Sequence, residues 1–251
     1  MPSAPRPKKL RLDAALVGRG LAETRSAAQR LIMAGQVFAG ERRLDKPGQL
    51  VAEDVALELR GQPHPWVSRG GLKLAHALDA FAIPVDGRVA LDVGASTGGF
   101  TDVLLQRGAA RVHAVDVGHG QLAWKLRNDL RVVVREKTNI RHLAPDALGG
   151  PVDLIVCDLS FIGLETALPA ALAMAAPGAH LVALIKPQFE VGKGRVGKGG
   201  IVRDPALHAE VCERVKSWLA ARPGWTVIGI VPSPIEGADG NREFLIGARF
   251  S

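Results

Sequence analysis

A glycine-rich stretch, DVGASTGGF from Asp92 to Phe100, directly follows an apolar run and has residue types that could do chemistry. Three structures are compatible with it. GASTG matches the Gly-x-Ser-x-Gly turn between a strand and a helix, which would make Ser96 the nucleophile of a hydrolase. Alternatively, glycines let the backbone approach a bound nucleotide closely. The third possibility is glycine packing without a ligand.

Asp116 separates these alternatives. A hydrolase needs an acid and then a histidine downstream, and no later histidine follows a convincing acid on a late strand. Asp116 lies 22 residues after Gly94, close to the roughly 20 expected for a carboxylate that accepts both ribose hydroxyls. Ser96 stands where a dinucleotide motif has its second glycine, which argues against NAD. The pattern therefore favours S-adenosylmethionine, a nucleoside cofactor without a pyrophosphate.

The residues expected around S-adenosylmethionine lie in this loop and at neighbouring strand ends. The loop should seat the methionine part, and Asp116 should bind the ribose. Asn139, after the third strand, is placed to meet the adenine edge, although an asparagine there could instead cap the loop. The whole set is Gly94, Ala95, Ser96, Thr97, Gly98, Gly99, Phe100, Asp116, Asn139 and Asp158.

Two charged residues end apolar runs in the second half of the chain. Asp158 closes VDLIVCD, and Lys186 closes HLVALIK before Pro187. Either could be a solvated residue at a strand end. Because parallel strands end at one edge of a sheet, both are expected beside the cofactor crevice, where the methyl acceptor must lie. Lys73 and Glu243 would be ordinary surface charges on composition alone.

A second glycine-rich segment, GKGRVGKG from Gly192 to Gly199, matches the Gly-x4-Gly-Lys part of a phosphate loop. Gly199 occupies the position where serine or threonine must hold magnesium, and no helix is expected directly after it. A phosphate loop is therefore disfavoured. The loop could instead close over an RNA backbone with Lys193, Arg195 and Lys198, and a plain solvated loop is an equal alternative.

Alternating strands and helices must position these residues. From Arg88 onward, the pattern predicts a Rossmann-like, doubly wound and mainly parallel sheet. The last two strands are joined too closely for a crossover and must be antiparallel. The expected strands are 88–94, 111–118, 131–136, 152–160, 180–187, 225–234 and 241–250, and the expected helices are 99–108, 121–129, 163–175 and 204–221.

Residues 1–60 form a separate and more basic block. They hold 11 basic and 7 acidic side chains, against 21 and 18 in the remaining 191 residues. Apolar residues at helical spacing predict two short helices, roughly 11–17 and 25–34, and then short strands of a small α+β domain. Residues 61–68 are predicted to be a linker, because GQPHP holds two prolines, and 69–251 a second domain. Trp66 is expected to pack between the domains, and stacking on a base is the alternative.

The order of residues 9–60 closely resembles the S4-like RNA-binding domain. The shared features are RLD at Arg11, the GLA turn, the TR start of the second helix at Thr24, the IMAGQV exit and the KPG turn. The resemblance implies contacts with an RNA backbone. The residues expected to make them are Arg11, Arg19, Arg25, Arg30 and Arg42, together with the loop cations Lys193, Arg195 and Lys198.

Residues 66–250 resemble the FtsJ-like ribose 2′-O-methyltransferases, whose segments match SRGGLK, CDLS, IKPQFE and GNREF in order. The family's Lys–Asp–Lys–Glu pattern then falls on Lys73, Asp158, Lys186 and Glu243. With its N-terminal domain, the whole chain resembles the TlyA family of ribosomal RNA 2′-O-methyltransferases, which are sometimes labelled hemolysins. The resemblance implies transfer of a methyl group from S-adenosylmethionine to a ribose of ribosomal RNA.

That reaction agrees with the residue types. The sulfonium methyl is already activated, so no metal is required, and the protein must align the reacting atoms and help to remove one proton. Lys186 is expected to contact the 2′-hydroxyl, either as a base or as a stabiliser of the developing alkoxide. Asp158 should orient Lys186, and Glu243 should position the lysines and the ribose.

Composition agrees with a ribosomal partner. The net charge of +7 and the pI near 9.8 favour a polyanion. Cys157 and Cys212 cannot form a disulfide framework or a zinc site alone. The uncharged stretch 168–185 contains a Pro-Gly pair, so helix, turn and buried strand are expected there rather than a membrane span, and the location is expected to be cytoplasmic.

Two other classes of function remain as alternatives. A membrane-active hemolysin would need a good amphipathic or spanning segment, which the sequence lacks. A non-catalytic RNA-binding or ribosome-assembly factor would have no need of the four charged residues of the Lys–Asp–Lys–Glu pattern.

Overall fold

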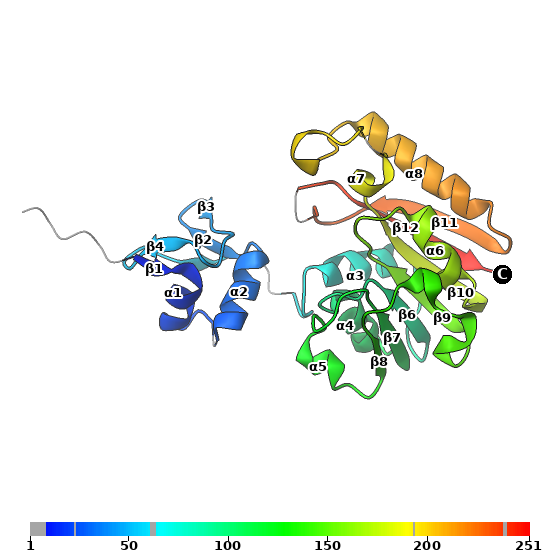
Figure 1. Cartoon of the computed structure of the whole chain (residues 1–251), viewed down its shortest axis with the longest axis horizontal. Helices are drawn as coiled ribbons and strands as arrows, with labels where there is room; N and C mark the ends of the chain where they lie inside the picture. Colours follow the sequence, from blue (N-terminus) through cyan, green and yellow to red (C-terminus); the bar gives the residue numbers. More distant parts are fainter. Residues whose placement is uncertain (1–8, 23, 61–63, 193, 238–239) are drawn as a thin grey trace, which may run out of the picture. The chain divides into compact units, whose positions relative to one another are not determined.

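The computed structural model describes residues 9–22, 24–60, 64–192, 194–237 and 240–251 (Figure 1). The chain divides into two compact units, Met1–Pro63 and His64–Ser251. Of the predicted RNA-binding residues, Lys193 and the side chain of Lys198 lie outside the described part.

The N-terminal unit packs two short helices with small antiparallel sheets. Thr24 caps the second helix by accepting a hydrogen bond from the backbone N–H of Ala27 at 3.1 Å. Apolar side chains at helical spacing, such as Leu12, Leu16 and Ile32, are fully buried between the elements, which confirms the two predicted helices. The elements are β1 (Lys9–Arg11), α1 (Leu12–Gly18), α2 (Arg25–Met33), β2 (Val37–Ala39), β3 (Arg42–Arg43), β4 (Leu50–Ala52) and β5 (Glu58–Leu59), with β1 paired to β4 and β2 to both β3 and β5.

The second unit is built on a seven-stranded sheet in the order β11-β12-β10-β9-β6-β7-β8. Strands β6 to β10 pair in parallel, and β12 runs antiparallel to both β10 and β11. The predicted mainly parallel sheet with an antiparallel last strand is therefore confirmed. The strands are β6 (Val89–Val93), β7 (Arg111–Val115), β8 (Val132–Arg135), β9 (Val152–Cys157), β10 (Ala175–Ile185), β11 (Trp225–Pro232) and β12 (Phe244–Phe250).

Helices cover both faces of this sheet. Successive residues of a strand point to opposite faces, so the strands place apolar side chains on both of them. One apolar core joins the sheet to α6 and α8, and the other joins it to α3, α4 and α5. Asp204 caps α8 through the N–H of Ala206 at 2.9 Å, as predicted. The helices are α3 (Gly70–Ala80), α4 (Gly99–Gln106), α5 (Trp124–Arg127), α6 (Leu164–Leu172), α7 (Pro187–Glu190) and α8 (Pro205–Ala220), with 3₁₀ turns η1 (Ile140–His142), η2 (Pro145–Leu148) and η3 (Lys198–Gly200).

Two local predictions were wrong. The helix expected over 121–129 is reduced to the single turn of α5. Pro177-Gly178 was expected to be a turn, but it lies inside β10, where the pairing with β9 shifts register between Ala175 and His180. Trp66 packs against the apolar core that joins the sheet to α3 and α4, beside Gly71, where a β-carbon would come within 2.6 Å of the tryptophan side chain. Its packing between the domains stays a prediction.

Among the helices of the described residues, none is both long enough and apolar enough to cross a membrane.

Candidate active site

The glycine-rich loop passes close to its neighbours at two points. Gly94 has φ +85°, and a β-carbon there would lie 2.5 Å from the carbonyl oxygen of Asp158. Gly98 has φ +95°, and a β-carbon would lie 2.2 Å from the side chain of Leu126. Only glycine meets both conditions without strain. The loop therefore brings bare backbone against the end of β9.

Asp116, just beyond β7, holds this loop in place. One carboxylate oxygen accepts the backbone N–H of Ser96 at 2.8 Å, and the other accepts the N–H of Gly118 at 2.7 Å. Ser96 itself has φ +48°, and its hydroxyl bonds to Gln121 at 3.2 Å rather than to a histidine. Ser96 therefore lacks the contact with a histidine that the nucleophile of a hydrolase needs.

A shallow hollow, partly open to solvent, lies beside Asp116. Two polar residues that the sequence analysis missed line it, Gln121 and Glu136. Glu136 accepts the N–H of Gly120 at 2.8 Å, and the Arg127 guanidinium beside it lowers the pKa of its carboxyl. Glu136 follows the apolar run of β8, so the strand-end criterion that identified Asp116 could also have found it.

Asn139 does what the alternative prediction expected. Its side-chain oxygen accepts the N–H of Arg141 at 3.1 Å and so caps η1. A contact with adenine remains a prediction that no observation tests.

Lys186 and Asp158 form an ion pair at the end of β9 and β10. The Lys186 ammonium lies 2.5 Å from Asp158 Oδ1 and 3.1 Å from the hydroxyl of Ser160. Both charged side chains are mostly buried. The ammonium therefore has a carboxylate and a hydroxyl as close polar neighbours.

Lys73 and Glu243 form a second ion pair, also at 2.5 Å. Lys73 lies on α3, and Glu243 immediately precedes β12; both are buried. Gly237 leaves the space that the Glu243 carboxylate occupies, since a β-carbon there would lie 2.6 Å from Oε1. The sequence analysis expected Asp158 to orient Lys186, but it left open which of the two lysines Glu243 contacts.

Strand register brings the two pairs to one edge of the sheet. Ile185 pairs with Phe244, so the next residue along β10, Lys186, and the residue before β12, Glu243, end up on neighbouring strands. Val93 pairs with Cys157, which sets the glycine loop beside Asp158. Two lysines and two carboxylates therefore meet next to the loop, with no net charge among them.

Asp92 is a buried acid that the sequence analysis did not select. Its Oδ2 accepts the hydroxyl hydrogen of Thr101 at 2.6 Å, which ties the end of β6 to the first turns of α4. Burial raises the pKa of Asp92 to about 7, and the nearby charges of Asp158 and Asp116 act in the same direction. An acid inside the apolar run VALDV was the available sequence signal.

Phe161 is exposed immediately after the segment that carries Asp158 and Ser160. Its side chain is 89% exposed, its φ is +68°, and its ring lies 5.0 Å from the ring of Phe189 on α7. A bulky residue rarely adopts a positive φ. Positive φ and exposure together mark a residue that sequence patterns could not single out.

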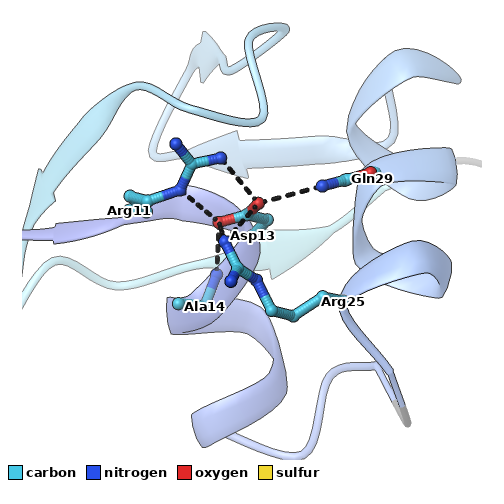
Figure 2. Close-up of polar contacts among 5 residues, drawn as sticks. All are labelled: Arg11, Asp13, Ala14, Arg25 and Gln29. Atoms are coloured by element: carbon cyan, nitrogen blue, oxygen red, sulfur yellow. Dashed lines mark hydrogen bonds and ion pairs between the residues drawn. The ribbon is translucent and has the colours of Figure 1, made fainter.

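The predicted RNA-binding arginines of the first unit have different surroundings. Arg11 and Arg25 both contact the buried carboxylate of Asp13 (Figure 2). Arg19 donates to the backbone carbonyls of Glu53 and Val55. Arg30 and Arg42 are exposed on α2 and β3.

In the second unit, Arg195 pairs with Glu210 at 2.5 Å, so part of its charge is already compensated. Within the described part of the chain, histidine, cysteine, aspartate and glutamate side chains form no cluster that could hold a metal ion.

Comparisons with known proteins agree with this architecture. Residues 66–250 match the family model of the FtsJ-like methyltransferases, and residues 10–55 match that of the S4 domain. A 16S/23S rRNA (cytidine-2'-O)-methyltransferase TlyA of Mycobacterium tuberculosis is 53% identical over 96% of this chain and 90% of its own length.

Two solved structures extend the comparison. A protein described as a hemolysin, from Streptococcus thermophilus, shares 44% identity and a TM-score of 0.76, covering 98% of this chain and 90% of its own. The N-methyltransferase NodS of Bradyrhizobium japonicum, solved with S-adenosyl-L-homocysteine, shares 19% identity and a TM-score of 0.52 over 75% of this chain and 89% of its own. At that identity, the second likeness shows the fold alone.

Proposed function

The chain belongs to the FtsJ-like methyltransferase family, and on that premise we propose that it transfers a methyl group from S-adenosylmethionine to a ribose 2′-hydroxyl of ribosomal RNA. The observation that carries this proposal is the pairing of Lys186 with Asp158 and of Lys73 with Glu243 beside the glycine-rich loop. The 2′-O-methyltransferase named among its relatives supports the choice of acceptor.

The loop and the Asp116 carboxylate suit S-adenosylmethionine. Gly94 and Gly98 keep open the space that side chains would fill. Asp116 accepts two backbone N–H groups, and a carboxylate has about four acceptor positions, so capacity remains for ribose hydroxyls. When bound, the cofactor supplies an activated methyl group on a sulfonium. The protein supplies position, through the loop, and a charged acceptor for the ribose.

Lys186 is the residue that we assign to the 2′-hydroxyl. An ammonium held by Asp158 and Ser160 donates a hydrogen bond. In that state it stabilises the negative charge that develops on the ribose oxygen as the oxygen bonds to the methyl carbon, the methyl–sulfur bond breaks and the hydroxyl proton leaves to water. This geometry favours the stabilising role over that of a base. The buried pair of Lys73 and Glu243 joins α3 to the start of β12 beside this site.

The exposed ring of Phe161 suits a nucleobase. It lies two residues after Leu159 on the segment that positions Lys186, and unstacked RNA bases bind to aromatic side chains. A base on Phe161 would hold its ribose near the lysine. We therefore assign Phe161 to the base of the target nucleotide.

The S4 domain is assigned to the binding of ribosomal RNA. Its exposed arginines are available for phosphate contacts, which supply most of the affinity in complexes of this kind. Ribosomal subunits in the cytoplasm are the partner that this assignment implies.

The direct test uses tritiated S-adenosylmethionine and ribosomal subunits from cells that lack this protein. We expect label on a ribose 2′-oxygen, identified by resistance of the adjacent phosphodiester to alkaline cleavage. Lys186→Ala is the matched negative control. Subunits that bind the protein but take up no label would instead support a non-catalytic assembly factor.

A further inference from the structure

Asp13 is a buried carboxylate that two exposed arginines share (Figure 2). Arg11 donates to it through Nε at 3.1 Å and Nη2 at 2.9 Å, and Arg25 donates through Nη2 at 3.1 Å. Gln29 Nε2 at 3.1 Å and the backbone N–H of Ala14 at 2.8 Å complete its partners. The Arg11 guanidinium, with help from Gln29 and Arg25, holds the pKa of the Asp13 carboxyl well below its usual range, against the opposing effect of burial.

This contact fixes two cations that come from different elements. Arg11 ends β1 and Arg25 begins α2, and the side chain of Asp13 at the start of α1 lies between them. The Asp13 side chain is fully buried, whereas those of Arg11 and Arg25 are 50% and 58% exposed. The turn at Gly48 leaves room for Arg11, since a β-carbon there would lie 3.3 Å from its Nη1.

Both guanidinium groups keep free donors after this contact. A guanidinium carries five N–H donors in a fixed plane, and only part of each set is directed at Asp13. One negative and two positive charges leave one positive charge in excess. Two planar guanidinium groups that share one carboxylate and keep spare donors suit a phosphate group, which accepts such bonds in pairs.

We propose that Asp13 is a positioning residue that holds Arg11 and Arg25 as a two-guanidinium clamp for one phosphate of the RNA backbone. The inference rests on the proposed function and deepens it, because it names the device by which the first unit grips its substrate. Without the carboxylate, two long side chains would have to be ordered by the RNA itself, at a cost in affinity.

The clamp and simple charge attraction predict opposite effects of a substitution at Asp13 on RNA affinity. Replacing Asp13 by asparagine removes a negative charge, so a protein that attracts RNA only by its net charge would bind more tightly. If Asp13 instead positions the arginines, the same substitution weakens binding. Arg11→Lys gives a second test, because it keeps the charge and loses the planar fork that contacts Asp13 at two points.

The experiment measures the affinity of the full-length protein for ribosomal subunits from cells that lack it, over a series of KCl concentrations. We expect Asp13→Asn and Arg11→Lys each to weaken binding about five- to tenfold at moderate salt. The slope of log affinity against log salt should fall by about 0.7–0.9, the value for one lost phosphate contact. Glu41→Gln and Arg60→Lys, from an exposed ion pair of the same unit, are the matched controls and should stay within twofold.

A double-mutant cycle separates positioning from a general effect on folding. In a protein that already carries Arg11→Ala and Arg25→Ala, Asp13→Asn should cause no further loss of RNA affinity, because its effect passes through the arginines. A further loss there, or unchanged or tighter binding of the single Asp13→Asn variant, would overturn the clamp. If the parent protein itself fails to bind the subunits, the proposed function fails and not the clamp alone.

Discussion

The two units of this protein pair cations with carboxylates in opposite ways. In the S4 domain, the carboxylate of Asp13 is buried while its two arginines are 50% and 58% exposed. In the methyltransferase unit, the lysines are enclosed as well, with Lys73 and Lys186 only 9% and 11% exposed. Exposed cations can reach a polyanion in solution, whereas enclosed ones can contact only a group that enters the site.

This difference predicts which interactions salt should weaken. Salt screens exposed charges strongly and buried pairs much less. Removal of one partner from a buried pair is costly, because the other charge is left uncompensated. Binding of RNA by the first unit should therefore depend on salt, and the chemistry of the second should depend on the integrity of its pairs.

The largest expected effect separates chemistry from binding. Lys186→Ala should lower the rate of methyl transfer to ribosomal subunits by about 10²–10⁴-fold, because general acid–base and electrostatic groups contribute that much. The affinities for RNA and cofactor should stay nearly unchanged, since the lysine acts mainly in the transition state. Single-turnover rates and separate binding measurements check both statements.

Lys216→Ala is the matched control for Lys186. This lysine is an exposed residue of α8 that pairs with Glu213, and its loss should leave the rate unchanged. A Lys186→Ala enzyme within threefold of the parent rate would contradict the assigned role.

The next prediction concerns RNA binding by the first unit. Removal of residues 1–60 should largely abolish methylation of ribosomal subunits at moderate salt, because the phosphate contacts of the S4 domain are lost. Cofactor binding should survive, since His64–Ser251 is a compact unit with its own cores. Calorimetry with S-adenosylmethionine and a methylation assay at several salt concentrations measure the two properties. Full-rate methylation by the shortened protein would show that the RNA is gripped elsewhere.

A smaller effect is expected at the cofactor loop. Asp116→Ala should weaken S-adenosylmethionine binding about tenfold to a hundredfold, because a hydrogen bond to a charged group contributes about 1.5–3 kcal/mol. Loss of the bonds to Ser96 and Gly118 also loosens the loop. Calorimetry with Asp146→Ala, an exposed aspartate of η2, provides the control. Equal affinity in both variants would refute the placement of the cofactor ribose.

The last prediction concerns stability and its dependence on pH. The pKa of Asp92 is raised to about 7 in the folded protein, above the value near 3.9 in an unfolded chain. Between these values the folded state binds more protons, so this group lowers the free energy of unfolding as pH rises from about 4 to 7. Urea unfolding of Asp92→Asn should show that part of the pH dependence removed. An identical pH profile in parent and variant would mean that Asp92 titrates normally.

Much of the architecture could be predicted from sequence. Apolar runs at strand length placed the strand ends, and therefore Asp116, Asp158 and Lys186, at one edge of the sheet. Local errors came from tertiary contacts that override local patterns. The segment over 121–129 forms only one helical turn, and Pro177-Gly178 extends β10.

The candidate site residues differ in the same way, since some follow a sequence pattern and others do not. Asp116, Asp158 and Lys186 were selected by their position after an apolar run, and Glu136 meets the same criterion although it was not selected. Only the structure singles out Gln121, which lines the hollow beside Asp116, and Phe161, which is exposed in a left-handed conformation.

The sequence by itself determined the two domains, the sheet with its antiparallel last strand, and the residue types at the sheet's ligand edge, because periodicity and turn chemistry are local properties. Only the tertiary structure decided that Glu243 pairs with Lys73. The two residues are 170 positions apart, and their charged groups lie 2.5 Å from each other. Ion pairing depends on distance in space, and the packing of α3 against β12, which no single segment encodes, sets that distance.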